Sequence, residues 1–182
     1  MLSVEGKNNQ GAVQLPVQML RFPGGEWHVR LEMPELAAIC DAFEIHALLQ
    51  NADQVMQLLM LTDALRRVAP AARLHLNMPY VPYARQDKPV SNDQTFALHA
   101  FARQLNAMCF SKVSVLDPHS DVALELIKFS VAAYPKKIVD DLVTTVPVDV
   151  DRSVINPFRY ISGEKYQEQV PRWKDLPAGY AF

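Results

Sequence analysis

The chain has 182 residues, of which 49% are hydrophobic, and a formal net charge of -2 at pH 7. This length and this hydrophobic fraction are sufficient for one domain with a well-buried core. The small net charge and the lack of a basic stripe argue against a general binder of nucleic acids or membrane surfaces, because such proteins cluster Lys and Arg to neutralise phosphates.

The cysteines and the amino terminus indicate the cellular compartment. Cys40 and Cys109 are far apart in the sequence and both have apolar neighbours. We interpret them as reduced thiols in the core of an intracellular protein, with a disulfide as the less favoured alternative. The first ten residues lack a basic start followed by an apolar run, and no apolar segment is long enough to span a bilayer. The sequence therefore predicts a cytoplasmic protein.

The first predicted element is a β-hairpin. Its strands are residues 17–22 and 26–33, and the second strand has apolar side chains at every second position. Between them lies Pro23-Gly-Gly25, where the glycines permit positive φ in the turn.

Strands and helices alternate after the hairpin. In chain order we predict a short helical or turn segment from Pro34, a strand at 42–49, a helix with apolar positions from Val55 to Val68, a strand at 73–78, a helix opening near Ser91 and a strand at 112–116. This alternation is typical of right-handed parallel α/β units. We therefore predict an α/β fold, with a parallel sheet that has helices on both faces, plus the amino-terminal β-hairpin.

Two of these helices have predicted starts. The segment Asn51-Ala52-Asp53 supplies a cap for the first long helix. Ser91 and Gln94 have the spacing of a capping box and predict the start of the next helix. The predicted buried face of that second helix comprises Leu98, Phe101, Leu105 and Met108.

The later part of the chain has weaker patterns. We predict short helices at 122–129 and 136–143, and strands at 130–134 and 153–155. From 156 to 182 there are prolines and scattered aromatic residues without a clean period. We interpret 1–155 as one domain and 156–182 as an irregular carboxy-terminal arm that packs on the domain or on a neighbour.

A charged run follows the predicted strand at 73–78. It comprises Arg85, Gln86, Asp87 and Lys88 and lies between two prolines that stiffen it. A guanidinium can hold phosphate with two parallel hydrogen bonds, the amide can bind a ribose or a base edge, and the Lys adds a point charge. Parallel α/β sheets bind ligands at the carboxyl ends of their strands, so we expect an anion site here. A solvated surface turn is the alternative.

Asp117 and His119 follow the next predicted strand. Alternate residues just past a strand can point the same way, so this pair could share a divalent metal or its waters. The alternatives are an Asp that caps the next helix and a hydrogen-bonded loop His.

Phe22 and Glu26 flank the glycines of the hairpin turn. An exposed Phe could stack on a base, and the Glu could accept a hydrogen bond from its amino group or from a ribose. The alternative, favoured on the residues alone, is a core Phe and a solvated Glu.

Four segments together resemble the amino-terminal half of the ribose-phosphate pyrophosphokinases (PRPP synthetases). They are Phe22-Pro-Gly-Gly-Glu26, residues 53–65, Pro82-Tyr-Ala-Arg-Gln-Asp-Lys88 and Leu116-Asp-Pro-His119, and their order and approximate spacing match the family. The resemblance covers residues 17–121, and it implies a phosphoribosyltransferase-like fold.

The resemblance also implies a reaction and a set of roles. Diphosphate would pass from Mg-ATP to ribose 5-phosphate, giving PRPP and AMP, in a homo-oligomer whose ATP site is shared between subunits. The charged run around Arg85 would hold ATP, and His119 with Asp117 would work with Mg²⁺. Phe22 and Glu26 would reach the adenine from a neighbouring subunit. Such chemistry depends on positioning and charge neutralisation, and no residue is assigned as catalytic.

The sequence departs from the family pattern in two respects. Gly24 stands where the family usually has Asp or Asn. In addition, no flexible loop with catalytic Lys and Arg and no glycine-rich ribose-phosphate loop is recognised, so we expect the acceptor half to be absent and 156–182 to be a remnant of it. Activity would then need further sequences or subunits.

Two other functions remain as alternatives. The first is a non-catalytic nucleotide-binding or assembly subunit of a PRPP synthetase. The second is a phosphoribosyltransferase that uses Asp140 and Asp141. Such an enzyme needs glycines for the phosphate loop, whereas Val146 and Pro147 follow here. We therefore interpret the two acidic residues as a helix end.

Overall fold

The computed structural model describes residues 2–134. In chain order its elements are β1 (Leu2–Asn8), β2 (Gly11–Leu15), β3 (Val17–Arg21), β4 (Trp27–Leu31), α1 (Pro34–Ala38), β5 (Ala42–Ala47), α2 (Ala52–Val68), β6 (Arg73–Met78), α3 (Ala97–Ala107), β7 (Lys112–Leu116), α4 (Asp121–Leu126) and β8 (Ser130–Ala133).

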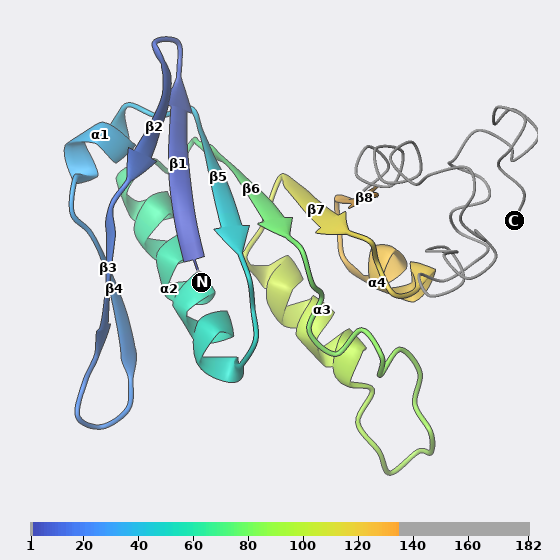
Figure 1. Cartoon of the computed structure of the whole chain (residues 1–182). Coiled ribbons are helices and arrows are strands. Elements are labelled where there is room, and N and C mark those ends of the chain that lie inside the picture. The colour runs from blue at the N-terminus through green and yellow to red at the C-terminus, as the bar shows by residue number, and fades with distance from the viewer. Residues whose placement is uncertain (1, 135–182) are drawn as a thin grey trace, which may run out of the picture. The chain divides into compact units, whose positions relative to one another are not determined.

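These elements build a six-stranded sheet and a separate hairpin (Figure 1). The strand order of the sheet is β2-β1-β5-β6-β7-β8. Strands β5 to β8 are parallel, whereas β1 is antiparallel to both of its neighbours, β2 and β5. The predicted α/β fold with a parallel sheet is confirmed.

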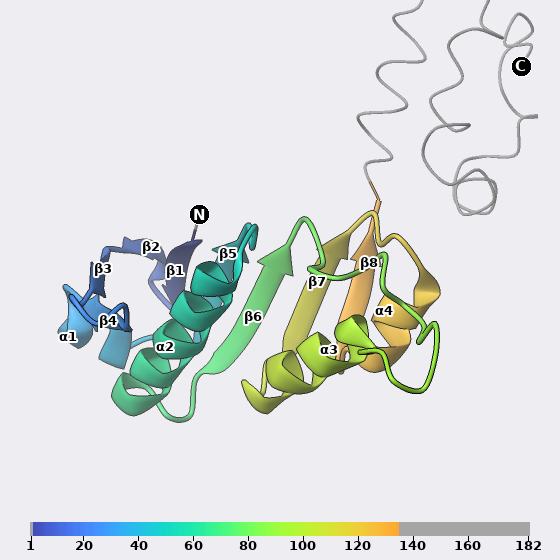
Figure 2. The ribbon, with the colours of Figure 1, turned by 90° about the horizontal axis from the view of Figure 1, so that it is seen from below.

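The long helices cover one face of this sheet. From β5 to β8, each strand lies next to the preceding one and always on the same side of it. Right-handed crossovers between these strands therefore place α2, α3 and α4 in a single layer on one face of the sheet. Figure 2 shows this layer beneath the strands. The helices that the sequence predicted for the opposite face do not occur within residues 2–134.

The core lies between the sheet and the helix layer. Phe43 and Ile45 of β5 and Leu74 and Leu76 of β6 are fully buried there. The helices contribute Leu58, Leu61 and Leu65 from α2 and the predicted face of α3, namely Leu98, Phe101, Leu105 and Met108. Burial of one such side chain contributes roughly 1.5–3 kcal/mol to folding.

The predicted hairpin is present as β3 and β4. Val29 and Leu31 are buried on the side of β4 that packs against α2. At the other end Gly25 has a φ of 98°, as the predicted positive-φ turn requires. Residues 2–15 form a second hairpin, β1 and β2, that the sequence analysis did not predict. It extends the parallel sheet with an antiparallel pair.

A glycine in β1 marks the closest packing in that second hairpin. A Cβ atom placed on Gly6 would lie 2.5 Å from Cys40 Sγ and 3.2 Å from Leu15 Cδ1. The absence of a side chain therefore lets β1 lie against the turn that follows α1. The same glycine interrupts the apolar alternation of the strand, which is why the pattern was missed.

The predicted start of α3 is wrong. The helix begins at Ala97, and Phe96 at its N-cap makes no side-chain cap hydrogen bond. Ser91 and Gln94 form a turn instead, in which the Gln94 amide donates to the Ser91 carbonyl at 3.2 Å. The Ser91 hydroxyl bonds to the Asp93 carboxylate, so it is not available as a cap.

The predicted cap of α2 is confirmed and yields a test. Asn51 Oδ1 accepts a hydrogen bond from the Gln54 amide at 3.0 Å. We expect Asn51→Ala to lower the free energy of unfolding by about 1 kcal/mol, because one amide of the first turn loses its partner. Urea denaturation measures this change. Asn92→Ala, at an exposed loop position, is the control, and equal effects of the two substitutions would contradict the cap.

Other predictions have mixed outcomes. The helix and the strand expected after residue 121 are present as α4 and β8. Both cysteines are free thiols, and Cys40 is buried as expected. Cys109 is exposed, contrary to the prediction, because it lies in a left-handed conformation, with a φ of 56°, where the chain turns out of α3. The predictions for 136–143, Asp140, Asp141, 153–155 and 156–182, and the domain boundary at 155, lie outside the described residues.

Within residues 2–134, no helix is long and apolar enough to cross a membrane.

Candidate functional site

Two loops leave the sheet at the same edge. Strands β6 and β7 are parallel and hydrogen-bonded to each other, with Asn77 opposite Ser114 and Met78 opposite Val115. The chain continues from β6 into the segment with the charged run and from β7 into the segment with Asp117 and His119 (Figure 1). We call this edge the rim. The charged run and the segment with Asp117 and His119 therefore both start from this end of the sheet, as a shared site requires.

The loop after β6 is anchored at its start. Val81 and Ala84 are almost fully buried, and the Ala84 amide donates to the Val81 carbonyl at 3.2 Å. The Gln86 amide donates to the Tyr83 carbonyl at 2.8 Å, and Tyr83 has a left-handed φ of 63°. The Gln86 carbonyl in turn accepts from the Leu98 amide in the first turn of α3, at 3.3 Å. The backbone under the charged run is therefore fixed to the core.

The charged side chains of this loop face solvent. Arg85, Gln86 and Lys88 are exposed, and Asp87 is half-buried. A guanidinium and an ammonium on a fixed backbone can bind an anion with little loss of backbone freedom.

The loop after β7 holds a carboxylate oxygen without a protein partner. The Asp117 amide donates to the Ala133 carbonyl at 2.8 Å, and Asp117 has a left-handed φ of 43°, a conformation that Asp adopts more readily than most residues. Its Oδ1 atom is buried and makes no hydrogen bond, whereas His119 is exposed. Asp117 does not cap α4, since Ser120 occupies the N-cap position. A buried orphan oxygen of this kind is a suitable ligand for a cation.

A metal at the rim would need ligands from outside this part of the chain. Among residues 2–134 there is no group of three or more His, Cys, Asp or Glu side chains that could hold a metal ion. Mg²⁺ commonly takes one or two carboxylates and completes its shell with water and phosphate oxygens. Asp117 and His119 fit that pattern better than a site made of protein ligands alone.

Phe22 and Glu26 lie elsewhere. They occupy the tip of the β3–β4 hairpin, where the Phe22 amide donates to the Glu26 carbonyl at 2.9 Å. Phe22 is 51% exposed and its ring lies 5.9 Å from the His28 ring, so it is not a core residue. The hairpin flanks the sheet beside α2, whereas the charged run follows β6 toward α3 (Figure 1). The structure thus brings the two rim loops together and separates this pair from them within one chain.

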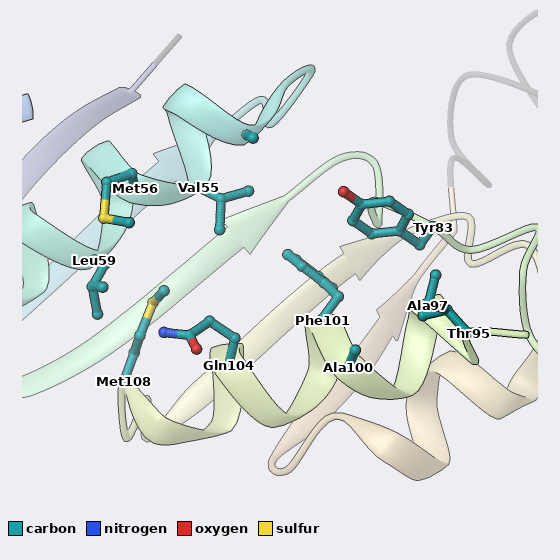
Figure 3. A pocket seen from close by; sticks show the side chains of 11 residues that line it. Val55, Met56, Leu59, Tyr83, Thr95, Ala97, Ala100, Phe101, Gln104 and Met108 are labelled. Carbon is teal, nitrogen blue, oxygen red and sulfur yellow. The ribbon is translucent and has the colours of Figure 1, made fainter. Parts of the chain in front are cut away.

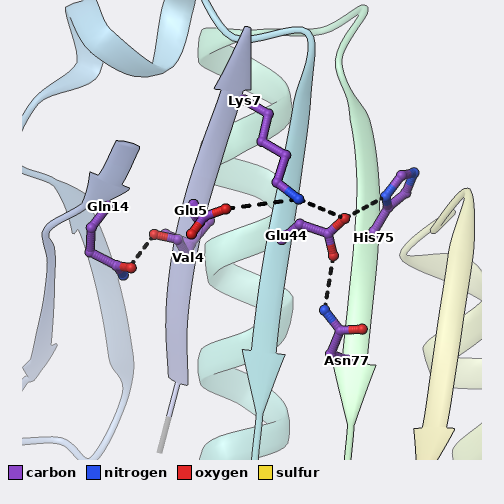
Figure 4. A network of polar contacts seen from close by, with 7 residues as sticks. All are labelled: Val4, Glu5, Lys7, Gln14, Glu44, His75 and Asn77. Carbon is purple, nitrogen blue, oxygen red and sulfur yellow. Dashed lines mark hydrogen bonds and ion pairs between the residues drawn. The ribbon is translucent and has the colours of Figure 1, made fainter. Parts of the chain in front are cut away.

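The sequence analysis missed a polar network on the face of the sheet opposite the helices (Figure 4). Glu44 of β5 lies at its centre. Its carboxylate is 3.0 Å from His75 Nδ1 and 3.4 Å from Lys7 Nζ, and it accepts from Asn77 Nδ2 at 2.9 Å. Polar residues alternating with apolar ones in β5 and β6 could have predicted it.

The network lowers the pKa of Glu44. Burial raises this pKa, but hydrogen bonds from His75 and Asn77 and the positive charge of Lys7 outweigh the burial, so the net change is downward. A lowered pKa in the folded state stabilises the protein above the unfolded-state pKa. This contribution disappears as the pH falls through the folded-state pKa.

Glu44→Gln tests this linkage. We expect the variant to be less stable than the parent chain at pH 7, and the difference to shrink as the pH falls below the ordinary Glu pKa of about 4.3. Thermal unfolding across this pH range measures it. Glu125→Gln, at an exposed position on α4, is the control. A pH-independent difference would show that Glu44 acts through packing and not through its charge.

Comparison with known proteins supplies a family. The model of the N-terminal domain of ribose phosphate pyrophosphokinase matches residues 7–108, more than half of the chain. A ribose-phosphate pyrophosphokinase from Thermococcus kodakarensis is 30% identical over 118 residues, which are 64% of this chain and 40% of that protein. One from Bacillus subtilis is 32% identical over 101 residues, which are 55% of this chain and 31% of that protein. The chain therefore spans less than half the length of these relatives.

The fold agrees with a solved structure. The phosphoribosylpyrophosphate synthetase from Mycobacterium smegmatis aligns with a TM-score of 0.67 and 21% sequence identity, over 88% of this chain and 55% of that one. At this identity the match shows the fold.

Proposed function

Because the chain belongs to the ribose-phosphate pyrophosphokinase family through the amino-terminal domain of that family, we propose that its rim binds Mg-ATP for diphosphoryl transfer. The acceptor would be ribose 5-phosphate and the products PRPP and AMP. The observation that supports this most directly is the parallel pairing of β6 with β7, which brings the loops of Arg85 and Asp117 to one edge.

In this proposal the charged run binds the nucleotide. Arg85 would hold phosphate oxygens through its planar guanidinium, and Lys88 would add a second positive charge. Gln86 would hydrogen-bond to the ribose or the base. Asp87, which is half-buried, would contact the nucleotide together with these side chains.

Asp117 and His119 would hold the Mg²⁺ together with phosphate oxygens and water. The buried Asp117 Oδ1 atom, which has no hydrogen-bond partner, supports this assignment. When bound, the ion would neutralise part of the triphosphate charge. The contribution of the chain itself is to position the nucleotide and to neutralise part of its charge.

The hairpin would act on a neighbouring subunit. Phe22 is exposed and lies at the tip of the β3–β4 hairpin. This hairpin lies beside α2, on the opposite flank of the sheet from the segment after β6, so within one chain we do not expect Phe22 to stack on a base held at the rim (Figure 1). In a homo-oligomer it could reach the rim of the next copy, and Glu26 with it. A Cβ atom on Gly24 would lie 2.5 Å from Glu26 Oε2, so the glycine leaves space for this carboxylate to fold back over the turn.

The second candidate is a non-catalytic nucleotide-binding or assembly subunit of a cytoplasmic PRPP synthetase. Its basis is the exposed charged run on a backbone fixed to the core, which can bind an anion without a second substrate. In that case ATP would bind at the same rim without turnover.

A coupled assay separates the two candidates. Purified chain is mixed with ATP, Mg²⁺ and ribose 5-phosphate, AMP release is followed, and ATP binding is measured by calorimetry on the same sample. Turnover supports the diphosphokinase, and ATP binding without turnover supports the second candidate. Absence of ATP binding would contradict both.

His119 provides a prediction specific to the metal. We expect His119→Ala to weaken ATP binding about tenfold in the presence of Mg²⁺, because a partner of the metal–phosphate group is lost. In EDTA the substitution should have little effect. Calorimetric titration with and without EDTA measures both values. Gln10→Ala, at an exposed position in the turn between β1 and β2 at the other end of the sheet, is the control. Equal losses in both conditions would assign His119 a structural role instead.

A further inference from the structure

A groove lies between α2 and α3, on the side of the sheet that the helices cover (Figure 3). Its volume is about 440 Å³. Helix α2 contributes Val55, Met56 and Leu59, and the loop after β6 contributes Tyr83. Volumes from about 300 Å³ upward are typical of pockets for small molecules.

Small side chains keep the groove open. Ala52 of α2 and Ala97 and Ala100 of α3 line it, and α2 and α3 have few close backbone approaches. Larger residues at these positions would fill the space, as leucines do elsewhere in the layer. The hollow is therefore a consequence of which residues face it.

The side chains that line the groove favour an aromatic ligand. Tyr83 and Phe101 lie with ring centroids 6.0 Å apart and their planes inclined at 51°. Met56 and Met108 provide thioethers to the same groove. Aromatic rings pair favourably with tilted aromatic neighbours and with thioether sulfur.

The polar groups that line the groove favour a neutral ligand whose edge can form hydrogen bonds. Thr95 and Gln104 line the groove together with the phenol of Tyr83, and none of the charged side chains within residues 2–134 does. In Figure 3 the Gln104 amide extends from α3 on the side of Met108. An amide both donates and accepts, so it can pair with a ring N–H or a ring nitrogen.

Tyr83 is held at the groove in an unusual way. It has a φ of 63°, although left-handed backbone is uncommon for residues other than Gly, Asn and Asp. Its side chain is 45% exposed, in spite of its contact with Phe101. Strained conformations of this kind cluster at ligand sites, where the surrounding structure maintains them.

We propose that this groove is a binding site for a neutral, flat heteroaromatic molecule of one or two rings, separate from the rim. The rings would lie between Tyr83 and Phe101 and the two methionines, and Gln104 would bond to the ring edge. The site does not depend on the proposed ATP binding. It shares one loop with the rim, since Tyr83 and Arg85 are both in the segment after β6.

The test uses indole as the probe and the full chain with methyl-¹³C-labelled methionine. On titration, the Met56 and Met108 methyl signals should shift and saturate with a Kd of about 1 mM, as expected for a ligand of this size. The signal of Met19, in β3, should not move. If Met56 and Met108 do not shift, or if all methionines shift alike without saturation, the proposal is overturned.

Substitutions locate the probe. Ala100→Trp fills the groove and should weaken indole binding at least about tenfold. Ala107→Trp makes the same change at an exposed position of α3 outside the groove and should leave the Kd unchanged. If Ala100→Trp does not fold, Gln104→Trp, at a second exposed position that lines the groove, is measured in its place. An unaltered Kd in a folded groove variant would refute the site.

Discussion

Arg85→Ala is expected to weaken ATP binding by about 2 kcal/mol, roughly 30-fold in Kd. A guanidinium that holds a phosphate with two parallel hydrogen bonds loses both on truncation. The backbone beneath it is fixed by the buried Val81 and Ala84, so a neighbouring side chain cannot easily take its place. Calorimetric titration of the chain with Mg-ATP measures the change.

Two further variants make the Arg85 result specific. Arg85→Lys keeps the charge and loses the planar fork, so its affinity should lie between those of the parent and of Arg85→Ala. Arg103→Ala removes an exposed arginine from α3, away from the rim, and should change the affinity little. If Arg85→Ala binds ATP as the parent does, the charged run is a surface turn and the proposed function loses its main support.

The rim could be predicted from sequence because it depends on strand ends. Strand β6 ends at Met78 and β7 at Leu116, and a loop with polar residues follows each. Consecutive parallel strands place such loops at one edge whatever the details of packing. The predicted proximity of the Arg85 and Asp117 loops therefore needed only the order of elements.

Features that depend on contacts between distant residues were not predictable in this way. Gly6 breaks the apolar pattern of β1 because a side chain at this position would collide with the Cys40 sulfur. The Ser91 hydroxyl donates a hydrogen bond to the Asp93 carboxylate, so it does not cap α3. The groove between α2 and α3 could not be predicted from the sequence, because alanines such as those that line it are common both in buried and in exposed parts of helices. The position of Phe22 required the hairpin to be placed against α2.

The single layer of helices also bears on the site. Parallel strands covered on both faces are apolar throughout, whereas β5 and β6 alternate and place Glu44, His75 and Asn77 on the face without helices. That alternation was visible in the sequence but was used only to assign strands. It would have indicated that one face of the sheet meets polar surroundings in the part of the chain described here.

Leu98→Ala should have the largest effect on stability, a loss of about 2–5 kcal/mol in the free energy of unfolding. Leu98 is fully buried in the first turn of α3, and its amide donates to the Gln86 carbonyl in the charged loop. Truncation leaves a cavity at the point where the helix supports the rim. Since domains are stable by only about 5–15 kcal/mol, this change is a large fraction of the total.

Urea denaturation of the full chain measures the loss, with the slope m compared between variants to verify that the unfolded state is unchanged. Leu116→Ala is the matched control, because the same atoms are removed from a side chain that is 42% exposed. We expect that control to cost less than about 1 kcal/mol. Similar losses at the two positions would mean that Leu98 is not packed as the structure shows, and the fixed backbone beneath Arg85 would then lose its support from α3.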